Sequence, residues 1–329
     1  MGSKRIAITR RELLKTTGLV AAGAGLAGLA HPAAAASSAP SPNRQRVLRI
    51  GHLTDMHIRP TGRGPTGLVA CLEHVQSLSD RPDIIFNGGD AIMSALGADK
   101  DSTRAQWEIW HKIMNENLEL PMIHCIGNHD VWGWQRSRAG TTGDEPLYGK
   151  AWVKEELELE SGFYSFDKAG WHFTVLDSVR ERGGGAYQPL LEEDQIEWLK
   201  ADLDAVPTET PILILSHVPV ISVTPYFFYD DIVENYQFRV AGALMHQDVH
   251  RLRDLFANYP NIKVCLSGHV HLVDRVDYNG ITYLCNGAVS GSWWHGRYQD
   301  CEPGYALVDL YDDGSFEREY IEYEWDVGE

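Results

Sequence analysis

Cysteine and basic residues are both scarce in this sequence. Five of the 329 residues are cysteine and none belongs to a Cys-x-x-Cys pair, which argues against a zinc ribbon, a thioredoxin-like redox centre and a disulfide-stapled miniprotein. Lysine and arginine number 29 against 46 aspartate and glutamate residues, so the formal net charge is −17. A protein that binds a nucleic-acid duplex needs a basic face, so this class is not expected. A small phosphorylated substrate is still compatible with the charge, because bound cations reverse it locally.

The sequence lacks two further features, and each absence argues against a class of protein. No Gly-x-Ser-x-Gly motif occurs, which argues against a serine hydrolase. No stretch after residue 36 is long and apolar enough to cross a bilayer. The chain is nonetheless 43% hydrophobic and 10% aromatic, which supports a sizeable packed core and excludes a disordered or collagen-like chain.

The first 36 residues differ in kind from the rest. A basic start leads into a glycine-rich apolar run and then into alanines 33–36, which is the layout of a cleaved secretory signal. Arg10-Arg11, followed by Leu13-Leu14-Lys15, resembles the twin-arginine export signal. The resemblance implies transport by the twin-arginine export machinery to the periplasm or outside the cell; an uncleaved anchor is the alternative. We expect residues 37–45 to form a flexible tether and residues 46–329 to form one catalytic domain.

Two segments match the Gly-x-Gly-x-x-Gly pattern of dinucleotide-binding proteins. Residues 23–28 lie inside the predicted signal and follow no strand, so we expect them to bind no cofactor. Residues 62–67 contain Pro65, and no hydrophobic strand leads directly into them. We interpret this second match as a connecting loop.

Short β-branched runs alternate with amphipathic segments from residue 46 onward. We predict strands over residues 47–53, 84–87, 122–126, 172–176, 212–216, 263–267, 281–285 and 306–310. We predict helices over residues 67–79, 104–117, 192–203 and 246–258. This alternation predicts an α/β domain whose strands are buried on both faces.

Polar residues follow five of the predicted strands directly. Open α/β sheets place their ligand sites at the carboxyl ends of strands, so these side chains are expected to meet. The candidate metal ligands are Asp55, His57, Asp90, Asn128, His217, His269 and His271. Seven oxygen and nitrogen ligands are too many for one zinc ion, which usually takes four. They suit two divalent ions that share a carboxylate, with manganese, iron, zinc, cobalt or nickel as candidates.

The ordered set of motifs resembles the calcineurin-like metallophosphoesterase superfamily. The motifs are Asp55-Met56-His57, Gly89-Asp90, Gly127-Asn128-His129-Asp130, His217 and Gly268-His269-Val270-His271. Over residues 46–310 the resemblance implies a four-layer α/β/β/α sandwich with a two-metal centre. It assigns one metal to Asp55, His57 and His271, and the other to Asn128, His217 and His269. Asp90 would bridge the two metals.

The resemblance also implies a mechanism and two catalytic residues. A hydroxide that bridges the two metals would attack phosphorus. His129 would lie near the leaving oxygen as a general acid or charge stabiliser. Asp130 would orient and charge the His129 ring; the alternative is that Asp130 caps the turn after the motif.

The motifs differ from those of two branches of the superfamily, which makes these branches less suitable but does not identify the substrate. Met93 stands where purple acid phosphatases carry a metal-binding tyrosine, and the arginine of the calcineurin-type Gly-Asp motif is absent. The pattern is closer to bacterial cyclic-nucleotide and glycerophosphodiester phosphodiesterases. The sequence therefore predicts an exported hydrolase of small phosphoesters, either a phosphodiesterase or a phosphomonoesterase. A non-catalytic metal-binding protein is the hypothesis from another class.

Substrate selection is expected to depend on three aromatic-rich loops. Two are insertions at about 132–160 and 222–247, and the third spans residues 291–298. Their aromatic side chains could stack on a substrate, or they could form a rim or an interface. Arg59, Arg63 and Arg297 are candidates for binding phosphate.

Overall fold

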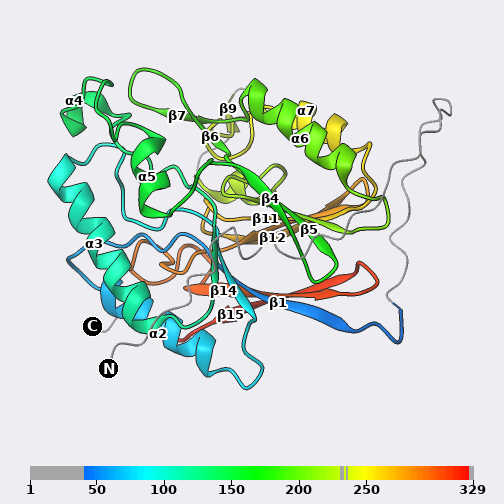
Figure 1. Cartoon of the computed structure of the whole chain (residues 1–329). Helices are drawn as coiled ribbons and strands as arrows, with labels where there is room; N and C mark the ends of the chain where they lie inside the picture. The colour runs from blue at the N-terminus through cyan, green and yellow to red at the C-terminus, as the bar shows by residue number, and fades with distance from the viewer. Residues whose placement is uncertain (1–40, 230–232, 235, 326–329) are drawn as a thin grey trace.

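A computed structural model describes residues 41–229, 233–234 and 236–325. The predicted signal over residues 1–36 and the first part of the predicted tether lie outside the described residues. Residues 41–45 make a turn and lead directly into strand β1 (Figure 1).

The described residues form fifteen strands and six α-helices. The strands are β1 Arg46–Leu53, β2 Ile84–Asn87, β3 Met122–His124, β4 Tyr164–Lys168, β5 Trp171–Leu176, β6 Val179–Glu181, β7 Tyr187–Pro189, β8 Ile212–Ser216, β9 Val233–Glu234, β10 Gln237–Phe238, β11 Ile262–Ser267, β12 Val273–Tyr278, β13 Ile281–Asn286, β14 Gly304–Tyr311 and β15 Phe316–Glu322. The helices are α2 Gly64–Ser77, α3 Lys100–Asn117, α4 Arg136–Ala139, α5 Lys150–Glu156, α6 Glu193–Ala205 and α7 Val249–Phe256, with a 3₁₀ helix at Thr224–Phe227.

Two mixed sheets carry the fold. The first has the strand order β15-β14-β1-β2-β3, and the second has the order β12-β13-β11-β8-β5-β4. Strands β1, β2 and β3 run parallel to one another, as do β5, β8, β11 and β13. The outer strands β14, β15, β12 and β4 are antiparallel to their neighbours. The parallel strands therefore end at a common edge in each sheet.

Side chains that alternate along the buried strands define the layers. On β8, Leu213 and Leu215 pack with residues of β1, β2 and β14 in a cluster between the two sheets. Ile212 and Ile214 of the same strand pack with α6 and α7 on the other face. A third cluster joins the first sheet to α2 and α3. Figure 1 shows the two sheets lying between these helix pairs, so the expected four-layer α/β/β/α sandwich is confirmed.

The predicted element boundaries differ from the structure by a few residues. Helix α3 begins four residues before the predicted start, because the Asp99 carboxylate accepts a hydrogen bond from the Ser102 N–H and caps its first turn. Helix α2 begins at Gly64, within the segment interpreted as a connecting loop. Pro65 is compatible with this start, because a proline in the first turn loses no intrahelical hydrogen bond.

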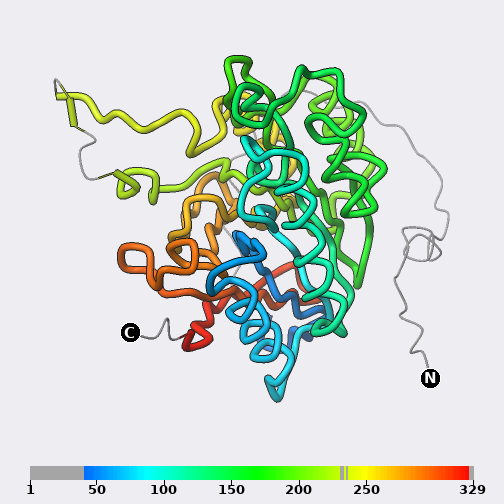
Figure 2. Tube along the Cα trace, turned by 90° about the vertical axis from the view of Figure 1, so that its left-hand side faces the viewer, coloured from blue at the N-terminus to red at the C-terminus, as the bar shows by residue number. Residues whose placement is uncertain are grey.

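The two predicted insertions have different environments. In the first, α5 packs against the segment that follows β3, where Trp152 meets Trp132 edge to face at 5.1 Å. In the second, the hairpin β9–β10 extends away from the body of the molecule (Figure 2). Phe227 and Phe238 of that insertion are 61% and 68% exposed, so they contribute little to the core.

The described residues contain all five cysteines, and their helices can be compared with the dimensions of a bilayer. All five cysteines are buried as free thiols. Across residues 41–325, apart from the positions left undescribed, no helix has both the length and the apolar character that a bilayer crossing requires.

A buried histidine in the second sheet predicts a pH-dependent stability. His172 Nδ1 lies 2.8 Å from Asp167 and Nε2 lies 3.1 Å from Asp202. Burial alone would lower the pKa of His172, but these carboxylates raise it above its ordinary value. Because the folded-state pKa is raised, this stabilisation is complete below the unfolded pKa near 6.5 and is lost as pH rises through the folded value.

We therefore expect His172→Gln to lower the free energy of unfolding more at pH 5.5 than at pH 9. The difference should be on the order of 0.5–1 kcal/mol, as for partly exposed ion pairs. Urea titrations at both pH values measure it, with exposed His250→Gln as the matched control. Equal losses at both pH values would show that the ring is neutral in the folded protein.

Candidate metal centre

The seven candidate ligands come from the ends of five parallel strands. Asp55 and His57 follow β1, and Asp90 follows β2. Asn128 follows β3 after three intervening residues. His217 follows β8, and the His-x-His pair follows β11. The ends of both sheets thus meet at one place, as the strand-end pattern predicts.

Left-handed backbone conformations turn most of these ligands into the site. Positive φ angles of 47° to 71° occur at Asp55, His57, Asp90, His269 and His271. Such conformations are uncommon for residues other than glycine and cost on the order of 1 kcal/mol each. Neighbouring glycines permit the close approach: a Cβ atom at Gly127 would lie 2.1 Å from Asp90 Oδ1, and one at Gly268 would lie 2.2 Å from Asp55 Oδ2.

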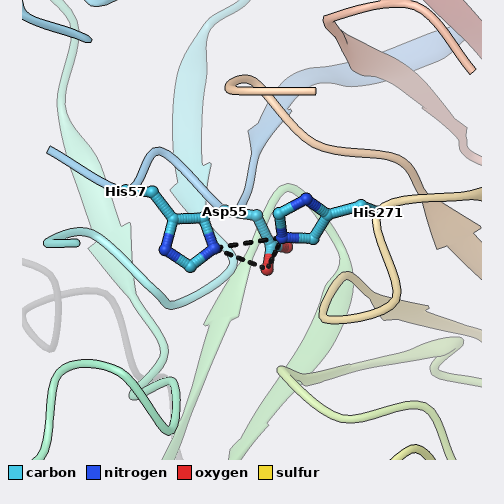
Figure 3. A group of neighbouring side chains, drawn as sticks. All are labelled: Asp55, His57 and His271. Atoms are coloured by element: carbon cyan, nitrogen blue, oxygen red, sulfur yellow. Dashed lines mark hydrogen bonds and ion pairs between the residues drawn. The ribbon is translucent and has the colours of Figure 1, made fainter. Parts of the chain in front are cut away.

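The first ligand group contains Asp55, His57 and His271 (Figure 3). His271 Nε2 lies 3.0 Å from His57 Nε2 and 3.3 Å from Asp55 Oδ1. The His271 Nδ1–H donates to the Gly291 carbonyl, which leaves Nε2 of the neutral ring with its lone pair toward the group. Asp55 Oδ2 accepts hydrogen bonds from Thr54 Oγ1 and the His269 N–H, whereas Oδ1 is buried without a hydrogen bond.

The second group contains Asn128, His217 and His269, together with Asp90. His217 Nδ1–H donates to the Gly88 carbonyl at 2.9 Å. Its Nε2 therefore lies between two acceptors, Asp90 Oδ2 at 3.2 Å and Asn128 Oδ1 at 3.2 Å. His269 Nε2–H donates to a backbone carbonyl at 2.9 Å, and its Nδ1 is buried without a partner.

Asp90 lies between the two groups. Its Oδ2 is 3.8 Å from His57 Nε2 and 3.2 Å from His217 Nε2. Its Oδ1 accepts the His129 N–H at 2.7 Å. Asp90 belongs to one set of converging ligand atoms with His57 and to another with His217 and His269. Asp90 thus lies between the two groups to which the family resemblance assigns the metals.

The pKa values of several candidate ligands are shifted by burial and by their charged neighbours. Burial works against ionisation of Asp90 and Asp55, but the neighbouring His217 and His271 hold the pKa of each carboxyl below its usual range. Burial also opposes a charge on His217, yet Asp90 raises the pKa of His217 to about 9. Burial lowers the pKa of His57 to about 4.

These observations fit bound cations. Lone pairs of imidazole, carboxylate and amide groups face one another within hydrogen-bond distance, which is unfavourable unless a proton or a cation lies among them. The raised pKa of His217 has the same cause, because the Asp90 carboxylate favours a positive charge at this place. Hard oxygen and borderline imidazole ligands together suit divalent transition metals. All seven candidate residues lie in or directly beside these groups.

His129 and Asp130 differ from what the sequence predicts in one respect. The His129 ring meets the His57 ring edge to face at 4.8 Å, so it lies beside the ligands. Its Nδ1 pairs with the Met93 carbonyl at 2.7 Å, not with Asp130. The expected orientation of the His129 ring by Asp130 is therefore wrong.

Asp130 instead binds the backbone of the loops that carry the candidate ligands Asp90 and Asn128. Its two oxygens accept the N–H groups of Gly127, Asp90 and Ala91 at 2.8–2.9 Å, with Ile92 at 3.3 Å. Burial and the Asp90 charge raise the pKa of Asp130 to about 7, although these N–H groups act in the opposite direction. The capping alternative describes this residue better than the catalytic one.

Two tryptophans contribute to the site without having been singled out as ligands or catalysts. Trp294 is buried, and its Nε1–H donates to the Met56 and His57 carbonyls at 2.9 and 3.1 Å. Trp293 places its ring 4.4 Å from that of His271. Only their position in an aromatic-rich loop could have drawn attention to them.

Two cavities adjoin the candidate centre. One, of about 310 Å³, is lined by Arg59, Thr61, Gly62, Arg63, Gly64, Met93, Trp293, Trp294 and His295. The other, of about 460 Å³, is lined by Ser94, Leu96, Gly97, Ala98, Asn128, His129, Gln135, Arg138 and Tyr187. Two of the three candidate phosphate-binding arginines thus line a cavity, whereas Arg297 is exposed and lines neither.

A four-layer sandwich that brings imidazole, carboxylate and amide groups together at its strand ends suits a metal-dependent hydrolase. The sequence model of the family described as calcineurin-like phosphoesterase matches residues 48–273. The chain therefore belongs to this family, and it is an enzyme that hydrolyses phosphoesters.

Curated proteins and solved structures agree with this family. A 3′,5′-cyclic-nucleotide phosphodiesterase of Nostoc sp. is 25% identical over 289 residues, which cover 83% of this chain and 92% of that protein. A protein of Arcobacter nitrofigilis named "Probable glycerophosphodiester phosphodiesterase GpdQ" is 22% identical over 250 residues, covering 71% and 76%. A dimetal phosphatase from Danio rerio superimposes with a TM-score of 0.54 at 13% identity, covering 85% of this chain and all of that one. This last likeness concerns the fold.

The hydrogen bonds of Asp130 should stabilise the folded protein. We expect Asp130→Asn to destabilise the protein by about 2–3 kcal/mol, because the amide N–H₂ would face backbone donors in a buried site. It should also weaken metal binding, because the loops that carry Asp90 and Asn128 lose their common acceptor. Urea unfolding and metal analysis measure the two effects.

The matched control is Asp254→Asn, an exposed aspartate on α7. If Asp130→Asn lowered the catalytic rate with stability and metal content unchanged, Asp130 would act on the reaction and not on the loops.

Proposed function

We propose that the protein is an exported phosphodiesterase that uses two divalent metal ions to hydrolyse small diesters. The main support for a diester substrate is the pair of cavities beside the candidate centre. A diester has two alcohol arms bonded to phosphorus. Each arm needs space beside the centre, although only one of them leaves in the reaction. One cavity adjoins the ligands of the first group and the other contains Asn128 and His129 in its lining. A monoester would need only one of them.

The number of ligands supports two metals. Each group offers three ligands besides Asp90, and the Asp90 carboxylate lies within 4 Å of a ligand atom of each. When bound, a pair of divalent cations lowers the pKa of water and binds the phosphoryl oxygens. The identity of the metals is open among manganese, iron, zinc, cobalt and nickel.

His129 is suited to hold a proton beside the leaving oxygen. The Met93 carbonyl accepts a hydrogen bond from Nδ1–H in both the neutral and the charged ring. The proton that can be transferred is therefore the one on Nε2. His129 also lines the larger cavity, where the leaving alcohol of a diester would be accommodated.

The relatives support diester hydrolysis, and the first residues support export. Both curated relatives carry names of phosphodiesterases. The twin-arginine pattern at residues 10–15 supports transport of the folded protein to the periplasm or beyond.

Asp90 should control metal content. We expect Asp90→Ala to lose most of both metals, because the remaining ligands of each group lose the charge that they share. Asp254→Ala should retain them. Elemental analysis after dialysis measures the content, and circular dichroism confirms that each variant is folded. Two ions per chain in folded Asp90→Ala would contradict the bridging position.

Metal-dependent hydrolysis of a diester is the direct test of the function. The chelated protein should be inactive, and adding back single metals should restore hydrolysis of bis(p-nitrophenyl) phosphate more than of p-nitrophenyl phosphate. Release of nitrophenolate measures both rates. Turnover of neither ester by metal-loaded protein would refute an esterase, and a preference for the monoester would refute a diesterase.

His129→Ala supplies the mechanistic control. It should keep its metals but lose rate, and the loss should be greater with diphenyl phosphate than with bis(p-nitrophenyl) phosphate. The poorer leaving group depends more on a proton donor, and general acids contribute about 10²–10⁴-fold. His250→Ala should change neither rate. Equal losses on the two esters would assign His129 to charge stabilisation alone.

A further inference from the structure

The smaller cavity begins directly beside the first ligand group. Trp293 lines it, and the Trp293 ring lies 4.4 Å from the His271 ring and 5.9 Å from the His57 ring. A group attached to phosphorus at the centre would therefore meet this cavity within a few bonds. Its volume of about 310 Å³ accommodates a small substituent.

The cavity wall is held in place by unusual backbone geometry. Trp293 and Trp294 both have positive φ angles, 48° and 70°, which bulky residues rarely adopt. Trp294 stabilises this turn by its two hydrogen bonds to the carbonyls of Met56 and His57. Its ring also packs on α2, where a Cβ atom at Gly67 would lie 2.2 Å from it. The turn that presents Trp293 is thus attached to a metal-binding loop and a helix.

The charge of this cavity is opposite to that of the protein. Among its described lining residues none is acidic, whereas Arg59, Arg63 and His295 are basic. The whole chain carries a formal net charge of −17. Arg59 makes no hydrogen bond or ion pair with another described residue. An unneutralised guanidinium beside a phosphoester site is available to a substrate anion.

The beginning of α2 adds to this positive character. Thr61, Gly62, Arg63 and Gly64 lead into the helix along the cavity wall. No side chain caps this helix end, and its first turn has no acidic residue. The partial positive charge of the helix dipole is therefore not offset by the helix itself. This segment is the second Gly-x-Gly-x-x-Gly match, in which Gly62 takes a φ of +84°.

The larger cavity does not share this feature. Its basic lining residues are His129 and Arg138, and Arg138 donates from Nη1 to Gln135 Oε1 at 3.0 Å. The remaining lining side chains are uncharged at neutral pH. The two arms of a substrate would thus meet different environments, and only the smaller cavity carries an unpaired arginine among the described residues.

We propose that the smaller cavity is a subsite for a second anionic group, a carboxylate or phosphate, on the non-leaving arm of the diester. Arg59 is its specificity-determining residue, with Arg63 and the Trp293 ring as further walls. The inference rests on the proposed function, which it narrows to diesters that carry an anion on one arm. It assigns the leaving arm to the cavity at His129.

Three diesters with the same leaving group test the subsite on metal-loaded protein. They are p-nitrophenyl 2-carboxyethyl phosphate, p-nitrophenyl ethyl phosphate and p-nitrophenyl phosphorylcholine. We expect kcat/KM for the anionic arm to exceed that for the ethyl arm by about tenfold or more, as for a charged hydrogen bond. The choline arm should be the poorest, because its cation meets Arg59.

Substitution of the arginine identifies the source of the preference. Arg59→Gln should bring the ratio of anionic to ethyl substrate to about one. Arg81→Gln is the matched control: it removes an exposed arginine that precedes β2, at the opposite end of the strand from the ligands, and should keep the wild-type ratio. A ratio near one in the wild type, or an unchanged ratio in Arg59→Gln, would overturn the subsite.

A binding measurement separates the subsite from the reaction. Metal-loaded protein should bind 3-phosphonopropionate about tenfold more tightly than propylphosphonate by calorimetry, and Arg59→Gln should bind them equally. This readout requires no turnover. If no diester is hydrolysed but the binding preference holds, the proposed function fails and the anion subsite stands. If diesters are hydrolysed without either preference, the function stands and the subsite fails.

Discussion

The Asp130 carboxylate accepts backbone N–H groups from the loops after β2 and β3, and the geometry of the candidate centre depends on this contact. Three of the donors belong to residues 90–92, and the fourth is the Gly127 N–H. Without the carboxylate these donors would be buried and unsatisfied, at about 1–3 kcal/mol each. The contact also fixes Asp90 and Asn128 relative to each other, since they lie on the two loops. One carboxylate therefore links the loops that bring candidate ligands from separate strands.

A fixed arrangement is needed because the candidate ligands repel one another unless a proton or a cation lies among them. Acceptors face each other around His217 Nε2 and His271 Nε2, and five ligands have left-handed backbones. The stability for this arrangement comes from elsewhere: three apolar clusters lie between the four layers. Bound cations would convert the repulsion into attraction, so metal binding would stabilise the folded domain. The strained loops keep the ligands close before any cation arrives.

The sequence was sufficient to predict the α/β class and the residues that the fold brings together at the strand ends, for a physical reason, and the family resemblance added the four layers. Buried parallel strands give continuous β-branched runs, and a polar residue that directly follows such a run lies at the edge of the sheet where ligands bind. The edge strands β4, β12 and β15 escaped prediction because they are partly exposed: β15 alternates polar and apolar residues and resembles a loop in composition. The partner of Asp130 could not be read either, because a carboxylate satisfies an imidazole and a backbone N–H equally well. The role of Trp294 depends on contacts with residues more than 200 positions away.

The net charge of the chain and the charge of the cavity linings have opposite signs. The acidic surplus of the chain is distributed over other parts of the molecule, whereas the described lining of both cavities has no acidic residue. A long polyanion that lay across the molecule would meet the acidic surplus, but a small diester would meet the arginines and any bound cations. On the proposed function, the same contrast would orient the substrate. An anionic arm would be attracted to the cavity with Arg59, and the opposite ester oxygen would be directed toward His129. Charge would then select which bond breaks before any chemistry takes place.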